Sequence, residues 1–145
     1  QGRYAEAVAG LKQLKRLGFP AQMLIAWASY HAGYNKEAYD WFEKILQRSP
    51  DHKDALIGGG YAAIRVNQFD HSEKWFGQIL EKDPLHDDAW YGMGLLRMKQ
   101  ERHDEAREIL ERVVKSNPKN MEARMMLGRL PKPKPDPSPT SKKKK

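Results

Sequence analysis

The sequence predicts an all-α fold, a solenoid built from tandem helical repeats, and two observations carry this prediction. Three prolines, Pro50, Pro84 and Pro118, stand 34 residues apart. One pattern precedes each proline: a small residue, a large apolar residue four positions later and a branched residue three positions after that. The three sets are Ala38, Phe42 and Ile45; Ser72, Phe76 and Ile79; Ala106, Leu110 and Val113. This spacing describes one face of an α-helix. Self-similarity at such a period is typical of a helical repeat array.

The pattern within each period resembles the tetratricopeptide repeat family. The best-matched segment, residues 87–120, carries the family's landmarks at Trp90, Met93, Gly94, Ala106, Leu110, Val113 and Pro118. Arg97 stands where that family usually has an aromatic residue. The resemblance covers about residues 1–130 and implies 34-residue units of two antiparallel helices, stacked as a right-handed α-solenoid.

Taken in order, this register divides the chain into six segments. They are the second helix of a truncated repeat at 1–18, complete units at 19–52, 53–86 and 87–120, a capping helix at 121–130, and a disordered tail rich in Pro and Lys at 131–145. The prolines Pro20, Pro50, Pro84 and Pro118 all fall at unit boundaries, where a helix can start at proline but the preceding one cannot continue. Because the chain starts within a repeat, we expect it to be a fragment of a longer protein.

The charge is concentrated in the tail. The chain has a net charge of +7, but residues 131–145 hold six lysines and Asp136 and so account for +5, which leaves +2 for the rest. The run Lys142 to Lys145 is a candidate contact for phosphate groups or anionic lipid. An electrostatic tether to nucleic acid or an anionic membrane is therefore an alternative function. The strict alternation of tail prolines predicts an extended segment.

The sequence offers no catalytic or metal-binding motif, and we expect no enzymatic activity, no cofactor and no metal. The chain has no cysteine, which excludes disulfides and thiolate metal sites. His52 and His86 are equivalent boundary positions one repeat apart, too distant to share an ion, and we expect them to be solvated loop residues. His71 and His103 are expected to pack or to lie at the surface. A further alternative is that the chain is an accessory module of a larger enzyme.

In this family, partners commonly bind the concave groove formed by the first helices of successive units. Carried over by register, the candidate groove residues are Met23, Trp27, Tyr30, Ile57, Tyr61, Arg65, Tyr91, Leu95, Met98 and Lys99, with Leu24, His31, Ile64, Met125, Met126 and Arg129 beside them. Aromatic and methionine side chains supply a large, adaptable contact area. The predicted function is thus a non-enzymatic scaffold that binds a peptide or protein partner, apolar or helical in character, and helps to hold a larger complex together.

One subset of the family clamps the acidic C-terminal tails of heat-shock chaperones with Lys and Asn side chains. The corresponding positions here are Met23, Trp27, Gly58, Asp88 and Gly92. No member of the clamp is present, so we do not expect binding of that type.

Two further features of the repeats leave alternatives open. Gly60, Gly94 and Gly128 occupy the family's small position, but Gly58 and Gly59 are additional. Their missing side chains would either leave slack in the helix or widen the groove. Trp41 and Trp75 occupy one equivalent position on the second helices, where packing between units is expected, and any exposed part would offer a second partner face.

Overall fold

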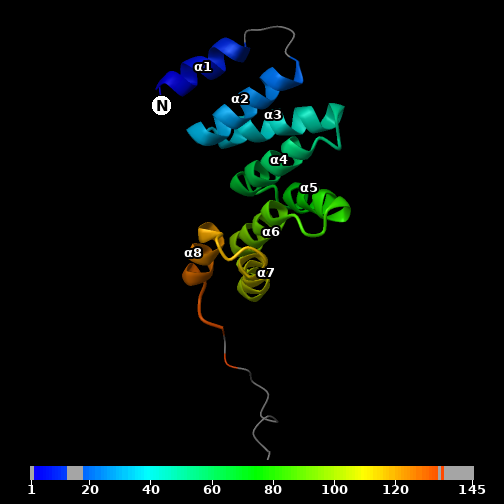
Figure 1. Cartoon of the computed structure of the whole chain (residues 1–145). Coiled ribbons are helices and arrows are strands. Elements are labelled where there is room, and N and C mark those ends of the chain that lie inside the picture. The colour runs from blue at the N-terminus through cyan, green and yellow to red at the C-terminus, as the bar shows by residue number, and fades with distance from the viewer. Residues whose placement is uncertain (1, 13–17, 134, 136–145) are drawn as a thin grey trace, which may run out of the picture.

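The computed structural model describes residues 2–12, 18–133 and 135, and the regular structure in this part of the chain consists of eight α-helices. They are α1 (Gly2–Lys12), α2 (Phe19–Ala32), α3 (Asn35–Arg48), α4 (Lys53–Arg65), α5 (Phe69–Lys82), α6 (Asp87–Lys99), α7 (His103–Ser116) and α8 (Met121–Arg129). No strand occurs among these residues. The predicted all-α solenoid is confirmed (Figure 1). Most of the predicted tail, residue 134 and residues 136–145, lies outside the described residues.

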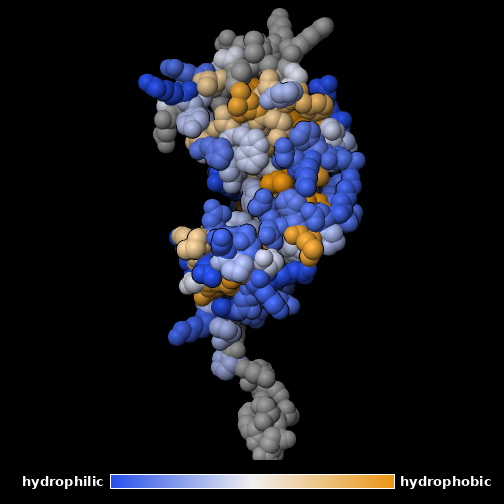
Figure 2. All heavy atoms as spheres, viewed as in Figure 1, coloured by the Kyte–Doolittle hydropathy of each residue, from blue (hydrophilic) through white to orange (hydrophobic). Residues whose placement is uncertain are grey.

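The helices pack in a linear stack. Helix α2 packs against α3, α4 against α5 and α6 against α7, and the successive pairs meet where α3 contacts α4 and α5 contacts α6. The first helices also contact each other, α2 with α4 and α4 with α6. At the two ends, α1 packs on α2 and α8 packs on α7. The result is an elongated, bent body that is hollowed on one side (Figure 2).

Side-chain caps recur at 34-residue intervals where α4, α6 and α8 begin. The Nδ1 atoms of His52 and His86 accept hydrogen bonds from the backbone N–H groups of Ala55, at 3.3 Å, and Ala89, at 3.2 Å. Asn120 does the same with its Oδ1 atom at 2.9 Å from the nitrogen of Ala123. Each cap satisfies one of the N–H groups that a helix start leaves without a partner. His52 and His86 thus lie between helices and are half-exposed, as expected, but their rings also cap the starts of α4 and α6, a role that the sequence analysis missed.

The turns inside the helix pairs share a second periodic feature, a left-handed backbone residue. Gly33, Asn67 and Glu101, again 34 residues apart, have φ angles of 85°, 63° and 59°. Glycine and asparagine tolerate this conformation, whereas a glutamate pays a steric cost between its Cβ and the backbone. The third turn is thus the most strained of the three.

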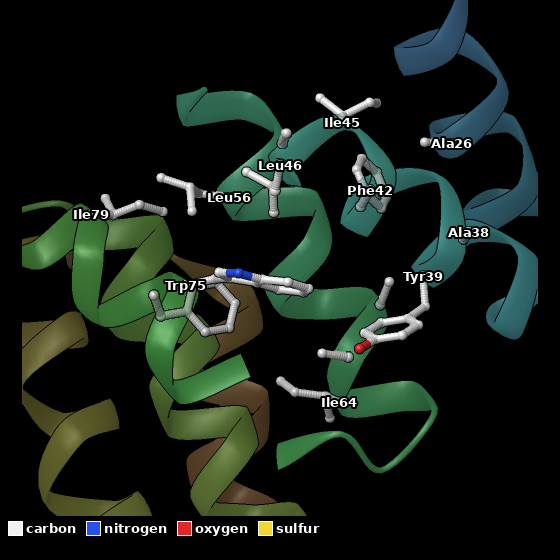
Figure 3. Packing of buried hydrophobic residues seen from close by; sticks show 14 of the residues in the cluster. Ala26, Ala38, Tyr39, Phe42, Ile45, Leu46, Leu56, Ile64, Trp75 and Ile79 are labelled. Carbon is white, nitrogen blue, oxygen red and sulfur yellow. The ribbon is translucent and has the colours of Figure 1, made fainter. Parts of the chain in front are cut away.

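The core is organised by large apolar side chains of the second helices that lie against glycines of the first helices. Phe42 and Phe76 are fully buried. A Cβ atom at Gly58 would overlap the ring of Phe42, and one at Gly60 would lie 2.5 Å from the Cζ atom of Phe76. Trp75 and Leu46, neighbours in the packed cluster of Figure 3, cover Gly59, where a Cβ would lie 3.0 Å from the indole.

The triple glycine therefore neither leaves slack nor widens a groove, and both alternatives predicted from the sequence are wrong. Gly58, Gly59 and Gly60 are all buried. The space that their side chains would occupy is filled by aromatic and aliphatic groups from α3 and α5. Their conformational cost in a helix, about 0.5–1 kcal/mol each relative to alanine, is thus offset by close packing.

Alanine at Gly58 and alanine at Gly77 should shift stability in opposite directions. Gly58→Ala should lower the free energy of unfolding by about 1–3 kcal/mol, because the new methyl group would displace the ring of Phe42 from a close-packed core. Gly77→Ala, also within a helix, should raise it by about 0.5–1 kcal/mol, since no atom lies within 4 Å of the new Cβ. Urea denaturation measures both. A stabilising Gly58→Ala would contradict the packing described above.

Glu101→Gly should stabilise the protein by about 0.5–1 kcal/mol, because glycine removes the steric cost of the left-handed conformation. The matched control is Gly33→Ala. Nothing lies within 4 Å of its new Cβ, so any loss of stability reports the strain of the backbone conformation alone. Gly33→Ala should lower the midpoint of thermal unfolding, whereas Glu101→Gly should raise it. A lower midpoint for Glu101→Gly would show that its side chain supports the turn.

Candidate partner-binding groove

A hollow of about 370 Å³ opens where α2, α4 and α6 face the same side of the stack. It is lined by Tyr30, Tyr61, Ile64, Arg65, Leu95, Met98 and Lys99. All seven were assigned to the concave groove from the 34-residue register. The lining combines aromatic and aliphatic surface with two cationic side chains, a composition that suits a segment with apolar anchors.

Helical periodicity explains why these residues meet. Tyr61 and Leu95 are equivalent positions in α4 and α6, as are Ile64 and Met98. Arg65 and Lys99 lie four residues after Tyr61 and Leu95, in the last turn of their helices. A cation there also interacts favourably with the helix dipole. Since residues three and four apart share one face of a helix, each unit presents the same strip to the hollow.

Arg65 and Tyr30 form a defined corner of the hollow. The guanidinium carbon of Arg65 lies 3.6 Å from the centroid of the Tyr30 ring, a cation–π contact. Its Nη1 atom also donates a hydrogen bond of 2.8 Å to the backbone carbonyl of Tyr30. Burial raises the pKa of the Tyr30 hydroxyl, and the charge of Arg65 opposes this rise. The pair joins α2 to α4 and orients the cation at the edge of the hollow.

Tyr61 joins α4 to α6 at the floor of the hollow. Its ring meets Phe76 edge-on, with centroids 5.2 Å apart. Its hydroxyl donates a hydrogen bond of 3.0 Å to the carbonyl of Asp88. Burial raises the pKa of Tyr61 well above its usual range, and the charge of Asp88 raises it further. The hydroxyl is therefore a neutral, fixed donor at neutral pH.

Nine of the sixteen residues assigned to the groove do not line the hollow: Met23, Leu24, Trp27, His31, Ile57, Tyr91, Met125, Met126 and Arg129. Met23, Trp27 and Ile57 are partly buried against the main core cluster. Trp27 meets Phe42 edge-on at 5.2 Å, so its indole is largely engaged within the protein. Tyr91 is 9% exposed and belongs to the core around α7. Burial, together with the charge of Glu122, raises the pKa of Tyr91.

The second helices carry a cluster that the sequence did not predict. The hydroxyl of Tyr39 on α3 is hydrogen-bonded to Nδ1 of His71 on α5, and the two rings are stacked with centroids 6.0 Å apart. Burial raises the pKa of Tyr39 to about 12, with Glu43 contributing. A hollow of about 280 Å³ beside His71 is lined by Glu43, Leu46, Gln47, Pro50, His71, Lys74, Trp75 and Gln78. The pairing of Tyr39 with His71 carries no sequence pattern that could have revealed it.

The two equivalent tryptophans differ in exposure. Trp75 of α5 is 6% exposed and packs against Tyr39 of α3 and Gly59 of α4, so the expected packing between units is confirmed for this residue. Trp41 is only partly buried, and the ammonium group of Lys44 lies 5.0 Å from its ring. Part of this indole is thus available on the outer surface.

The described part of the chain holds neither a metal-binding cluster nor a helix that could span a membrane. Within residues 2–12 and 18–133, no group of three or more His, Asp or Glu side chains is placed to hold a metal ion. None of the helices described is both long and apolar enough to cross a bilayer. The lysine run that predicts a tether lies outside the described residues.

Helix pairs stacked in a row, with a hollow along one side, are the architecture of α-solenoid proteins that act as interaction scaffolds. Two tetratricopeptide repeat models match the sequence, one over residues 1–53 and one over residues 73–130. The chain belongs to the tetratricopeptide repeat family. Proteins of this family generally bind peptide or protein partners and act as non-enzymatic scaffolds.

Solved structures share the fold at low sequence identity. A tetratricopeptide repeat protein from Parabacteroides merdae is 20% identical, with a TM-score of 0.78 over 88% of this chain and 51% of its own. YrrB, a tetratricopeptide repeat protein with an unusual peptide-binding site, is 19% identical, with a TM-score of 0.76 over 86% of this chain and 66% of its own. MamA from Desulfovibrio magneticus is 21% identical, with a TM-score of 0.73 over 88% of this chain and 73% of its own. No curated protein sequence matches the chain.

Proposed function

We propose that this chain is a non-enzymatic scaffold that holds an apolar or helical segment of a protein partner in the hollow between α2, α4 and α6, and so supports a larger complex. One observation carries the proposal. Seven side chains from three separate repeats, all in groove register, line a single hollow of about 370 Å³.

The chemistry of the lining supports an apolar anchor in the bound segment. Leu95 and Met98 lie partly exposed on α6 and line the hollow together with the aromatic rings of Tyr30 and Tyr61. Methionine adapts its shape, and the rings supply rigid contact area at little entropic cost. Arg65 and Lys99 are exposed at the edge of the hollow, where they can pair with carboxylates that flank the anchor.

The family and one structural neighbour agree with this proposal. Peptide or protein binding is general in the family. YrrB, similar in fold, has an unusual peptide-binding site, so related stacks present peptide sites in more than one way. The bound segment proposed here is distinct from an acidic chaperone tail, because the clamp positions hold Met23, Trp27, Gly58, Asp88 and Gly92.

Peptides selected from a displayed random library against the immobilised chain test the proposal. Leu95→Ala and Met98→Ala should each weaken the selected peptides by about 2 kcal/mol, roughly thirtyfold, because truncating a buried anchor contact at an interface has that effect. Isothermal titration calorimetry measures the affinity. Both side chains are partly exposed, so the helical circular dichroism signal should be unchanged.

Glu108→Ala is the matched control, since Glu108 is exposed on α7, outside the hollow. It should leave the affinity unchanged. Affinity should fall only modestly as salt is raised, because apolar contacts dominate and salt screens only the pairs with Arg65 and Lys99. If Glu108→Ala weakened binding while Leu95→Ala and Met98→Ala did not, the partner would bind the second helices and the proposal would be wrong.

A further inference from the structure

The first helices α4, α6 and α8 each carry a carboxylate in the first turn and a cation in the last turn. These charged residues are Asp54 and Arg65 in α4, Asp88 and Lys99 in α6, and Glu122 and Arg129 in α8. The helix dipole favours this order within each helix. Because α4 and α6 are equivalent helices that contact each other, their carboxylates lie at one end of the pair and their cations at the other.

The cations of α4 and α6 lie at one edge of the hollow between α2, α4 and α6. Arg65 and Lys99 both line this hollow, and both are exposed. Tyr30 holds the guanidinium group of Arg65 through its ring and its backbone carbonyl, neither of which neutralises the charge. Within the described residues, neither cation forms an ion pair with a carboxylate. This edge therefore attracts the carboxylates of a bound segment.

Two carboxylates lie at the opposite edge of the hollow. The hydroxyl of Tyr61 donates a hydrogen bond of 3.0 Å to the carbonyl of Asp88, which brings the first turn of α6 to this edge. Burial raises the pKa of Tyr61, and the charges of Asp88 and Glu122 raise it further, as carboxylates near its hydroxyl must. Both carboxylates are exposed, and neither is ion-paired in the part of the chain that the structure describes.

Helix α8 adds one charge of each sign near Tyr91. Burial, followed by the charge of Glu122, raises the pKa of Tyr91, whereas the charge of Arg129 lowers it. Glu122 stands in the register of Asp88, and Arg129 stands in the register of Leu95. The order from negative to positive along α6 is therefore continued in α8.

The distance between the two edges suits the width of one α-helix. Asp88 and Lys99 are eleven residues apart in α6, which corresponds to about 16 Å along the helix axis. An α-helix with its side chains is about 10–12 Å wide. Leu95 and Met98 lie between the two edges and line the hollow. A helix placed across α6 therefore has apolar side chains beneath it and a charged edge on each side.

The two charged edges also favour a helix over an extended segment. Side chains of an extended segment alternate between two opposite faces, so a segment that points apolar anchors into the hollow points its other side chains into solvent. A helix distributes its side chains around its axis, so it presents an apolar stripe with a separate flank on either side. Of the two, only the helix meets the floor and both edges at once.

We infer that the bound partner segment is an amphipathic α-helix whose apolar stripe is flanked by carboxylates on one side and by cations on the other. Its carboxylates pair with Arg65 and Lys99. Its cations pair with Asp88 and Glu122 across the hollow. This inference rests on the proposed function and adds the conformation, the charges and the direction of the partner. The direction follows because turning a helix end for end exchanges its two flanks.

The probes for this inference are peptides from the displayed random library whose affinity falls in Leu95→Ala. They should gain a helical circular dichroism signal when they bind the chain. Lys99→Glu and Asp88→Lys should each weaken them about tenfold, because each change turns an attraction into a repulsion. Isothermal titration calorimetry measures the affinity. Both positions are exposed, so the helical signal of the protein should persist.

Lys115→Glu and Glu108→Lys are the matched controls. They make the same changes of net charge at exposed positions of α7, outside the hollow, and should leave the affinity unchanged. A compensating peptide gives a second reading. When each carboxylate of a probe is replaced in turn by lysine, one replacement should make the peptide prefer Lys99→Glu over the unmodified chain.

The outcomes separate this inference from the proposed function. Probes that depend on Leu95 but bind Lys99→Glu and Asp88→Lys as tightly as the unmodified chain would overturn the inference and leave the proposed function standing. Probes that stay non-helical when bound, or that are weakened equally by Lys115→Glu and Lys99→Glu, would overturn it as well. A selection that yields no peptide dependent on Leu95 would remove the proposed function, and the inference with it.

Discussion

The ring of Phe76 lies against two glycines at once, and the architecture of the stack depends on this contact. Gly60 belongs to the same unit as Phe76, and Gly92 belongs to the next, so one side chain fixes the approach of α4, α5 and α6. A methyl group at Gly92 would overlap the ring, and one at Gly60 would lie 2.5 Å from it. Because each first helix is positioned by the second helix before it, a purely local contact, repeated, generates the whole solenoid.

In the other units the equivalent contact is made by side chains of different size, so that a smaller side chain on one helix faces a larger one on the other. A Cβ at Gly58 would overlap the ring of Phe42, and Ala26, which is equivalent to Gly60, lies in the same buried cluster as Phe42. Leu110, smaller than phenylalanine, meets Gly94, and on its other side the position of Gly92 is held by Met126, which packs in the same cluster. A shorter second-helix residue thus coincides with a longer first-helix residue, as close packing at constant helix spacing requires.

The period of the sequence predicted the fold and most of the hollow, because a helical register fixes which face each residue occupies. It placed Tyr30, Tyr61 and Met98 on one side, and they line one hollow. It could not predict burial along that side, since burial depends on neighbouring units, and Tyr91 lies in the core instead. The close packing at Gly60 and Gly94 was predicted from the family's small position. The packing at Gly58 and Gly59 and the histidine caps were missed, because each depends on a partner outside its own helix face. Arg97, which replaces an expected aromatic residue, pairs with Glu73 of α5 and Glu105 of α7, a substitution that only the assembled stack explains.

A double-mutant cycle between Phe76 and Gly92 tests the central claim most directly. Gly92→Ala, Phe76→Leu and the double variant are compared by urea denaturation with the unmodified chain. If the ring against the glycine sets the helix spacing, Gly92→Ala should be markedly less destabilising when leucine occupies position 76, with a coupling of about 1 kcal/mol or more. Additive effects of the two changes, within about 0.3 kcal/mol, would show that the two residues act independently and would contradict the account.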